Sequence, residues 1–206
     1  MKTVRALTLQ TYGGTASTQA SAMAAPAAGA GQVLVRVRAA GVNGLDWKVR
    51  EGYVRDVFPL QLPTVLGLEL AGVVEAVGAS VTRFKAGDRV MGPLGGLDAY
   101  SDLVAVNEVN LAPTPEALDD VTAAAMPVAA LTAWQSLHMA GPVVPGQRVL
   151  IQGCCRWRGR FRRAICQAPG CFRGSDSLWK GPRRRSRFGR RSGDRLPDAA
   201  LRVARE

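Results

Sequence analysis

The sequence predicts a small, mainly β domain over residues 1–118, connecting helices and the first strand of an α/β domain over 119–153, and a basic segment over 154–206. Three observations lead to this division. Short apolar runs between glycine and proline turns are typical of a curled β domain. An alanine-rich stretch with helical spacing follows Pro115. The composition then changes abruptly at Gly153.

The β domain is predicted from short runs with a period of two residues. Residues 4–9 form the first strand candidate, and the Gly, Ser, Thr and Ala stretch that ends in AAPAAGAG is expected to be a loose turn or linker. Residues 33–38 alternate valine with Leu or Arg, which favours a strand with one more polar face. Further strands are expected over residues 72–77, after the Gly-Asp turn of KAGDRV, and over residues 99–106.

Helices are expected at three places. Residues 41–52 contain a short helical turn between glycines. Proline and acidic residues at positions 115–120 suit the first turn of a second helix, where free N–H groups face negative charge. Pro127 breaks or kinks that helix, and a third carries Leu131 and Trp134. A buried-type strand at residues 149–151 then leads to Gly153.

Charge is divided unevenly along the chain. Residues 1–152 hold 11 Lys and Arg against 12 Asp and Glu, whereas the remaining 54 residues hold 16 against 4. All four cysteines also lie in this last part. A segment with few aliphatic residues and many like charges cannot offset its ordering entropy by burial, so we expect residues 154–206 to be disordered or poorly packed.

A shift of reading frame explains the break. The codon of Trp157 is TGG, and followed by the C of an Arg codon it reads GGC, glycine, one base later. With plausible codons, GCCRWRGRFRRAICQ becomes GAAGGVGGFAVQFAK and FGRRSGDRLP becomes SGADQVIDYR. The first string has the glycine turn and apolar helix spacing with which a dinucleotide-binding βαβ unit begins. We therefore expect a frameshift near Gly153.

Other classes of protein are disfavoured by the sequence. No apolar run is long enough to span a membrane and the first residues lack a signal-peptide pattern, so a cytoplasmic protein is expected. The cysteine spacing matches no paired zinc pattern. An arginine-rich segment can still bind nucleic acid or another polyanion non-specifically, which leaves a binding module as the alternative function.

Five segments of the chain carry a family resemblance. They are, in order, AAGVNGLDWKVREG, PTVLGLELAGVVEAVGASVTRFKAGDRVMG, AYSDLVAV, AAAMPVAALTAWQSL and PGQRVLIQG. Together they resemble the zinc-independent quinone oxidoreductase branch of the medium-chain dehydrogenase/reductase family, over residues 1–153. The resemblance implies a GroES-like N-terminal domain, a Rossmann domain, NADPH between them, and relatives that are usually homodimeric. Hydride would pass to a small-molecule quinone or α,β-unsaturated carbonyl.

Zinc is not expected at this site. Where zinc-dependent relatives have a Gly-His-Glu ligand motif, this chain has Gly67, Leu68 and Glu69, and Asn43 occupies the region of their cysteine ligand. Without an imidazole or a thiolate, a tetrahedral catalytic zinc site is implausible. The chemistry would then depend on orientation of the reactants and polarisation of the carbonyl.

The resemblance also implies four cofactor-contacting positions and one substrate-facing position. Asn43 and Asp46 would lie near the nicotinamide, although either could instead cap the short helix that follows. Thr132 would face the nicotinamide, or be an ordinary helical residue. Tyr53 could face the substrate, or be a partly buried loop residue.

Gly153 would begin the phosphate-binding turn, but its successors are unsuited to that task. Cys154, Cys155, Arg156 and Trp157 stand where small residues allow pyrophosphate to approach the backbone. We therefore expect this chain, as written, neither to bind NADPH tightly nor to be catalytically competent. The residues present identify no secure catalytic side chain.

Overall fold

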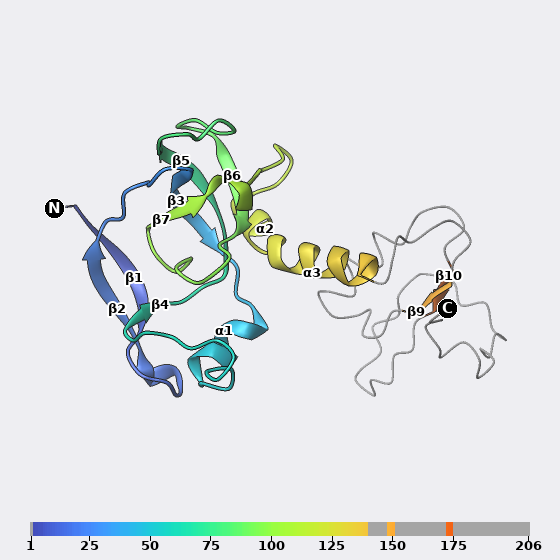
Figure 1. Cartoon of the computed structure of the whole chain (residues 1–206), viewed down its shortest axis with the longest axis horizontal. Coiled ribbons are helices and arrows are strands. Elements are labelled where there is room, and N and C mark those ends of the chain that lie inside the picture. Colours follow the sequence, from blue (N-terminus) through green and yellow to red (C-terminus); the bar gives the residue numbers. More distant parts are fainter. Residues whose placement is uncertain (1, 140–147, 151–171, 175–206) are drawn as a thin grey trace. The chain divides into compact units, whose positions relative to one another are not determined.

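The structure is a computed structural model that describes residues 2–139, 148–150 and 172–174. The described chain contains two antiparallel sheets, with three α-helices after or beside them (Figure 1). This is the mainly β architecture that the sequence predicts. Among the described residues, no helix is both long and apolar enough to cross a membrane.

The larger sheet has five strands in the order β7-β3-β5-β6-β8. Their bounds are β3 Gln32–Ala40, β5 Glu69–Val77, β6 Arg89–Pro93, β7 Leu103–Asn107 and β8 Ala112–Pro113. Strands β3 and β5 pair from Val33↔Val77 to Ala40↔Leu70, with irregularities after Leu34 and Val37. Such bulges bend a strand and increase its twist, which curls this sheet.

The smaller sheet has three strands in the order β2-β1-β4, with bounds β1 Thr3–Leu9, β2 Thr18–Ala24 and β4 Thr64–Val65. A single-turn helix, η1 (Thr15–Ser17), precedes β2. The expectation of a loose linker here is wrong for residues 18–24, because they pair with all seven residues of β1. The many Ala, Ser and Thr residues of this segment give no clear apolar alternation from which a strand could be predicted. The strand is stabilised by backbone hydrogen bonds to β1 rather than by burial of its side chains.

Aliphatic side chains from the larger sheet form the main core. Val33, Val35, Leu70 and Val90 have no exposed surface. They belong to one cluster that also contains Phe84 and residues of β7. The alternation of β3 therefore places its valines inside, as its period of two predicts.

Helices α1 and α2 each begin at a capping side chain. Helix α1 spans Gly44–Arg50, α2 Asp120–Ala124 and α3 Pro127–His138, and a single-turn helix, η2, spans Glu108–Asn110. The Asp119 side chain accepts a hydrogen bond from Thr122 N at 2.6 Å, so α2 begins later than Pro115. Pro127 takes the first position of α3, where its missing N–H costs nothing, and separates two helices rather than bending one.

Two described strands lie further along the chain. Strand β9 (Arg148–Leu150) pairs in parallel with β10 (Phe172–Gly174). A parallel pair needs a crossover connection, and it is typical of α/β units. The strand predicted at residues 149–151 is thus present through Leu150. Strand β10 lies inside the segment 154–206, for which the sequence indicated no strand, and the rest of that segment lies outside the described residues.

Candidate functional site

Asn43 and Asp46 form a reciprocal hydrogen-bonded cap at the start of α1. The Asn43 Oδ1 atom accepts from Leu45 N at 3.1 Å, and the Asp46 Oδ2 atom accepts from Asn43 N at 2.6 Å. This pattern satisfies free N–H groups of the first helical turn. The capping role considered for both residues is therefore present in the structure. A contact of either with a cofactor stays a prediction.

Tyr100 extends this hydrogen-bond network into the domain. Its hydroxyl lies 3.0 Å from Asp46 Oδ2 and 3.3 Å from the carbonyl oxygen of Gly41, and it donates to these acceptors. Asp46 is only 6% exposed, and its Oδ1 atom is buried without a hydrogen-bond partner in the part of the chain described. The buried Asp46 carboxylate therefore fixes the backbone at Asn43 through its hydrogen bond from Asn43 N.

Glu69 is the second buried carboxylate of the site, at 3% exposure. It begins β5, and its Oε2 atom accepts a hydrogen bond from Val128 N at 2.8 Å in the first turn of α3. Its backbone carbonyl accepts from Gly41 N at 3.0 Å. One residue therefore contacts both the segment that leads to Asn43 and the helix that carries Thr132.

The ionisation of this cluster is governed by burial. Burial raises the pKa of Asp46, while hydrogen bonds from Asn43 and Tyr100 lower it. Burial likewise raises the pKa of Glu69, against hydrogen bonds from Val128 and Asn43, and the Asp46 charge raises it further. The pKa of the Tyr100 phenol is raised by burial and by both carboxylates. The site therefore disfavours additional negative charge.

Thr132 lies half-buried on α3, and its hydroxyl donates to the carbonyl oxygen of Val128 at 2.6 Å. Trp134, on the same helix, is 53% exposed and stacks on His138 with ring centroids 4.0 Å apart. The His138 Nδ1 atom lies 2.8 Å from the Trp134 carbonyl oxygen, and His138 is the last residue of α3. The cofactor contact predicted for Thr132 stays a prediction.

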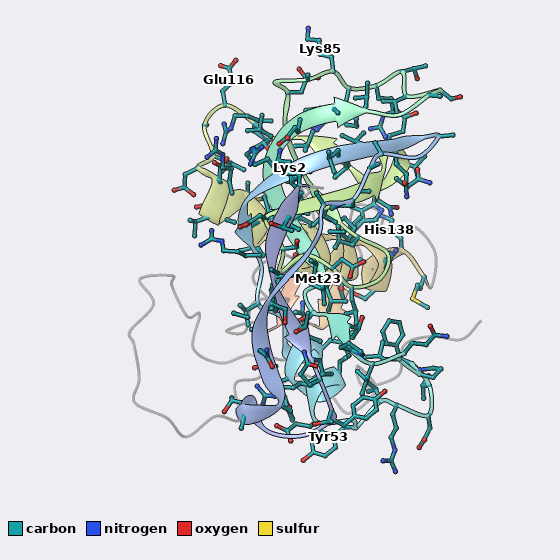
Figure 2. The ribbon with its side chains drawn as sticks, turned by 90° about the vertical axis from the view of Figure 1, so that its left-hand side faces the viewer. Lys2, Met23, Tyr53, Lys85, Glu116 and His138 are labelled. Atoms are coloured by element: carbon teal, nitrogen blue, oxygen red, sulfur yellow. The ribbon has the colours of Figure 1, made fainter. Side chains whose placement is uncertain are left out.

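Tyr53 follows α1 and is 72% exposed, so it is a surface residue rather than a partly buried one. Figure 2 shows it at the opposite end of the β domain from Lys85. Its ring meets the edge of Trp47, with centroids 5.6 Å apart at 88°. A contact with substrate stays a prediction. Gly153, the other predicted position, lies outside the described residues.

Sequence reasoning missed the roles of Tyr100 and Glu69. The available signal was Glu69 itself, an acid within the strand-like, otherwise apolar run LGLELAGVV. A charge in such a run requires partners, but the run does not say which.

Among the described residues, no group of three or more His, Cys, Asp or Glu side chains is placed to hold a metal ion.

Comparison with known proteins agrees with this architecture. Residues 29–116 match the alcohol dehydrogenase GroES-like domain. The bulged five-stranded sheet and the capped α1, which lie within these residues, therefore form a GroES-like domain of the alcohol dehydrogenase type. More particularly, the chain belongs to the quinone oxidoreductase branch of the medium-chain dehydrogenase/reductase family, whose members are enzymes.

Three relatives illustrate the match. A quinone oxidoreductase of Pseudomonas aeruginosa is 39% identical over 140 residues, which cover 68% of this chain and 42% of that protein. The crystal structure of a Pseudomonas syringae quinone oxidoreductase is 34% identical with a TM-score of 0.74, covering 84% of this chain and 52% of that one. The Escherichia coli quinone oxidoreductase complexed with NADPH is 29% identical with a TM-score of 0.72, covering 83% and 52%. The chain thus spans about half or less of the length of these relatives.

Proposed function

We propose that this chain derives from an NADPH-dependent, zinc-independent oxidoreductase that transfers hydride to a quinone or an α,β-unsaturated carbonyl. The observation that carries the proposal is the cluster of Asn43, Asp46, Glu69 and Tyr100, in which both carboxylates are buried and which joins the start of α1 to α3 in a domain of the quinone oxidoreductase type. A relative of this type has been solved with NADPH.

The described residues fit the nicotinamide half of the cofactor. The Asn43 Oδ1 and Thr132 Oγ1 atoms each make one protein hydrogen bond, and each retains a lone pair that can accept from an amide group. Asp46 and Tyr100 would keep Asn43 in position. NADPH, when bound, would supply the hydride, and the protein would orient the nicotinamide relative to the acceptor.

The residues after Gly153 do not fit the pyrophosphate half. The glycine turn of a dinucleotide site lets the backbone approach the phosphates, whereas Cys154, Cys155, Arg156 and Trp157 all carry larger side chains. We propose that the coding frame has shifted near Gly153 and that the chain as written binds NADPH weakly and is inactive.

Two experiments test this proposal. The gene is sequenced across the codons for residues 152–155 and beyond position 206, and a one-base change is expected to restore GAAGGVG and an open frame of about one further domain. The printed chain and the frame-restored protein are then titrated with NADPH, monitored by nicotinamide fluorescence. We expect saturable binding and quinone reduction only in the restored protein. Tight binding by the printed chain would contradict the proposal.

The charge division favours a second candidate function, a GroES-like module whose Arg-rich segment binds a polyanion. With 16 basic against 4 acidic residues after position 152, weak and salt-dependent binding to RNA is expected in either case. The codons of residues 153–206 discriminate between the two candidate functions. A segment selected for binding should not encode the continuation of an α/β domain in the next reading frame. A frame confirmed as printed, with preference for one RNA sequence at fixed salt, would favour this candidate.

A further inference from the structure

Helix α3 begins without a cap from its own sequence. Met126 occupies the N-cap position in a helical conformation, and its side chain makes no capping hydrogen bond. Pro127 follows at the first helical position and has no N–H. Val128 is therefore the first residue of α3 whose backbone N–H needs an acceptor outside the helix.

Glu69 supplies that acceptor from a distant part of the chain. Its Oε2 atom lies 2.8 Å from Val128 N, although the two residues are 59 positions apart. A carboxylate at this place also faces the positive end of the helix dipole. The first turn of α3 is thus held by the start of β5 rather than by its own neighbours.

The same residue also holds the segment that precedes Asn43. The Glu69 carbonyl oxygen accepts from Gly41 N at 3.0 Å, and Gly41 lies two residues before Asn43. Space for this arrangement depends on Gly41, where an added Cβ would lie 2.5 Å from Glu69 Cγ and 2.6 Å from the Ala124 carbonyl oxygen. Glu69 therefore connects the Asn43 segment, β5 and α3 at one point.

Burying the Glu69 carboxylate is expected to lower the stability of the fold. Glu69 is 97% buried, and within the described ranges it forms no ion pair with a basic side chain. An apolar residue would avoid the desolvation of a charge. A carboxylate at this position is explained if its hydrogen bond to Val128 N is needed to place α3.

We propose that Glu69 is a positioning residue, which fixes the start of α3, and with it Thr132, relative to Asn43. The inference rests on the proposed function, because Asn43 and Thr132 are the residues expected to face the nicotinamide. If α3 were free to slide or tilt, these two side chains would lose the fixed separation that a single bound ring requires.

The experiment uses NMR on the ¹⁵N-labelled full chain and needs no cofactor. Glu69→Ala removes the acceptor, Glu69→Gln keeps a neutral acceptor, and Glu75→Gln on the same strand is the matched control. Three quantities are measured. They are the amide exchange rate of Val128, the residual dipolar couplings of α3 compared with those of β3 and β5, and the pH dependence of the Val128 amide chemical shift.

In Glu69→Ala we expect Val128 to exchange roughly tenfold or more faster, and the α3 couplings to depart from the alignment of the sheet. Glu69→Gln should restore both to near the wild-type values. The wild-type Val128 shift should titrate above the usual range for glutamate, because burial raises the pKa of Glu69, with Asp46 of α1 and the Tyr100 phenol as the interacting groups. That titration should vanish in Glu69→Gln and persist in Glu75→Gln.

Wild-type exchange and couplings in Glu69→Ala would overturn the proposal. A Val128 titration that survives in Glu69→Gln would overturn it equally, and this readout applies even where the alanine variant folds poorly. Failure of the proposed function is seen separately, as absence of NADPH binding by the frame-restored protein. That result would leave the Val128 readouts unchanged.

Discussion

Tyr100→Phe tests the buried hydrogen-bond network most directly. The substitution keeps the ring, which packs against the core, and deletes only the hydroxyl that lies 3.0 Å from Asp46 Oδ2. Hydrogen bonds to charged groups contribute about 1.5–3 kcal/mol, and the other Asp46 oxygen has no partner among the described residues to compensate. We expect a loss of about 2 kcal/mol in the free energy of unfolding near neutral pH.

The loss should depend on pH with a definite sign. Burial raises the folded-state pKa of Asp46, so its proton stabilises the folded state at acid pH, and this contribution is lost as pH rises through the raised pKa. The Tyr100 hydroxyl lowers that pKa, so its deletion raises it further. Tyr100→Phe should therefore cost more at about pH 7.5 than at about pH 4, where a larger fraction of the Asp46 carboxyl is protonated.

The assay is urea denaturation followed by far-ultraviolet circular dichroism at both pH values. The slope of the free energy of unfolding against urea concentration should be unchanged, which shows that the denatured state is the same in both proteins. Tyr53→Phe is the control, because Tyr53 is 72% exposed, and a change within about 0.5 kcal/mol is expected. An equal cost of Tyr100→Phe at the two pH values, or a larger cost at acid pH, would refute the assigned charge on Asp46.

Three further substitutions test the packing around the site. Gly41→Ala should lower the free energy of unfolding by about 1–3 kcal/mol, because the added Cβ would lie 2.5 Å from Glu69 Cγ. Gly44→Ala is the control, since an added Cβ there has nothing within 4 Å, and it should be tolerated. Both variants are compared with the wild type by thermal denaturation. Leu70→Ala removes a side chain with no exposed surface and should cost about 2–5 kcal/mol in urea denaturation. Arg89→Ala breaks 2.7 Å hydrogen bonds to a carbonyl oxygen before α2 and a carboxylate within it, and should cost about 1 kcal/mol by the same assay. A neutral result for any of the three would contradict the packing described.

Local patterns predicted the fold where burial and sequence period coincide. The valines of β3 alternate in sequence and lie inside the sheet, so the strand could be predicted from residues 33–38 alone. Strand β2 could not be predicted in this way. Its small residues are ordered by pairing with β1, and pairing between two separate segments leaves no pattern within either one.

The candidate site shows the same limit. The Asn43 and Asp46 cap is a local pattern, an Asn followed three residues later by an acid, and sequence reasoning recognised that both could serve as caps. The bonds from Glu69 to Val128 and from Tyr100 to Asp46 join residues 59 and 54 positions apart. Only the folded chain brings these partners together, so their identity could not be derived from spacing.

The capping and cofactor roles of Asn43 are compatible for a physical reason. A side chain that is to orient a bound ring must first be fixed itself, and Asn43 is fixed by its bond to Leu45 N and by the Asp46 carboxylate on its own N–H. These bonds hold the amide in one direction whether or not a cofactor is present, which lowers the ordering cost of binding. The cap therefore acts as the support on which a cofactor contact at Asn43 would depend.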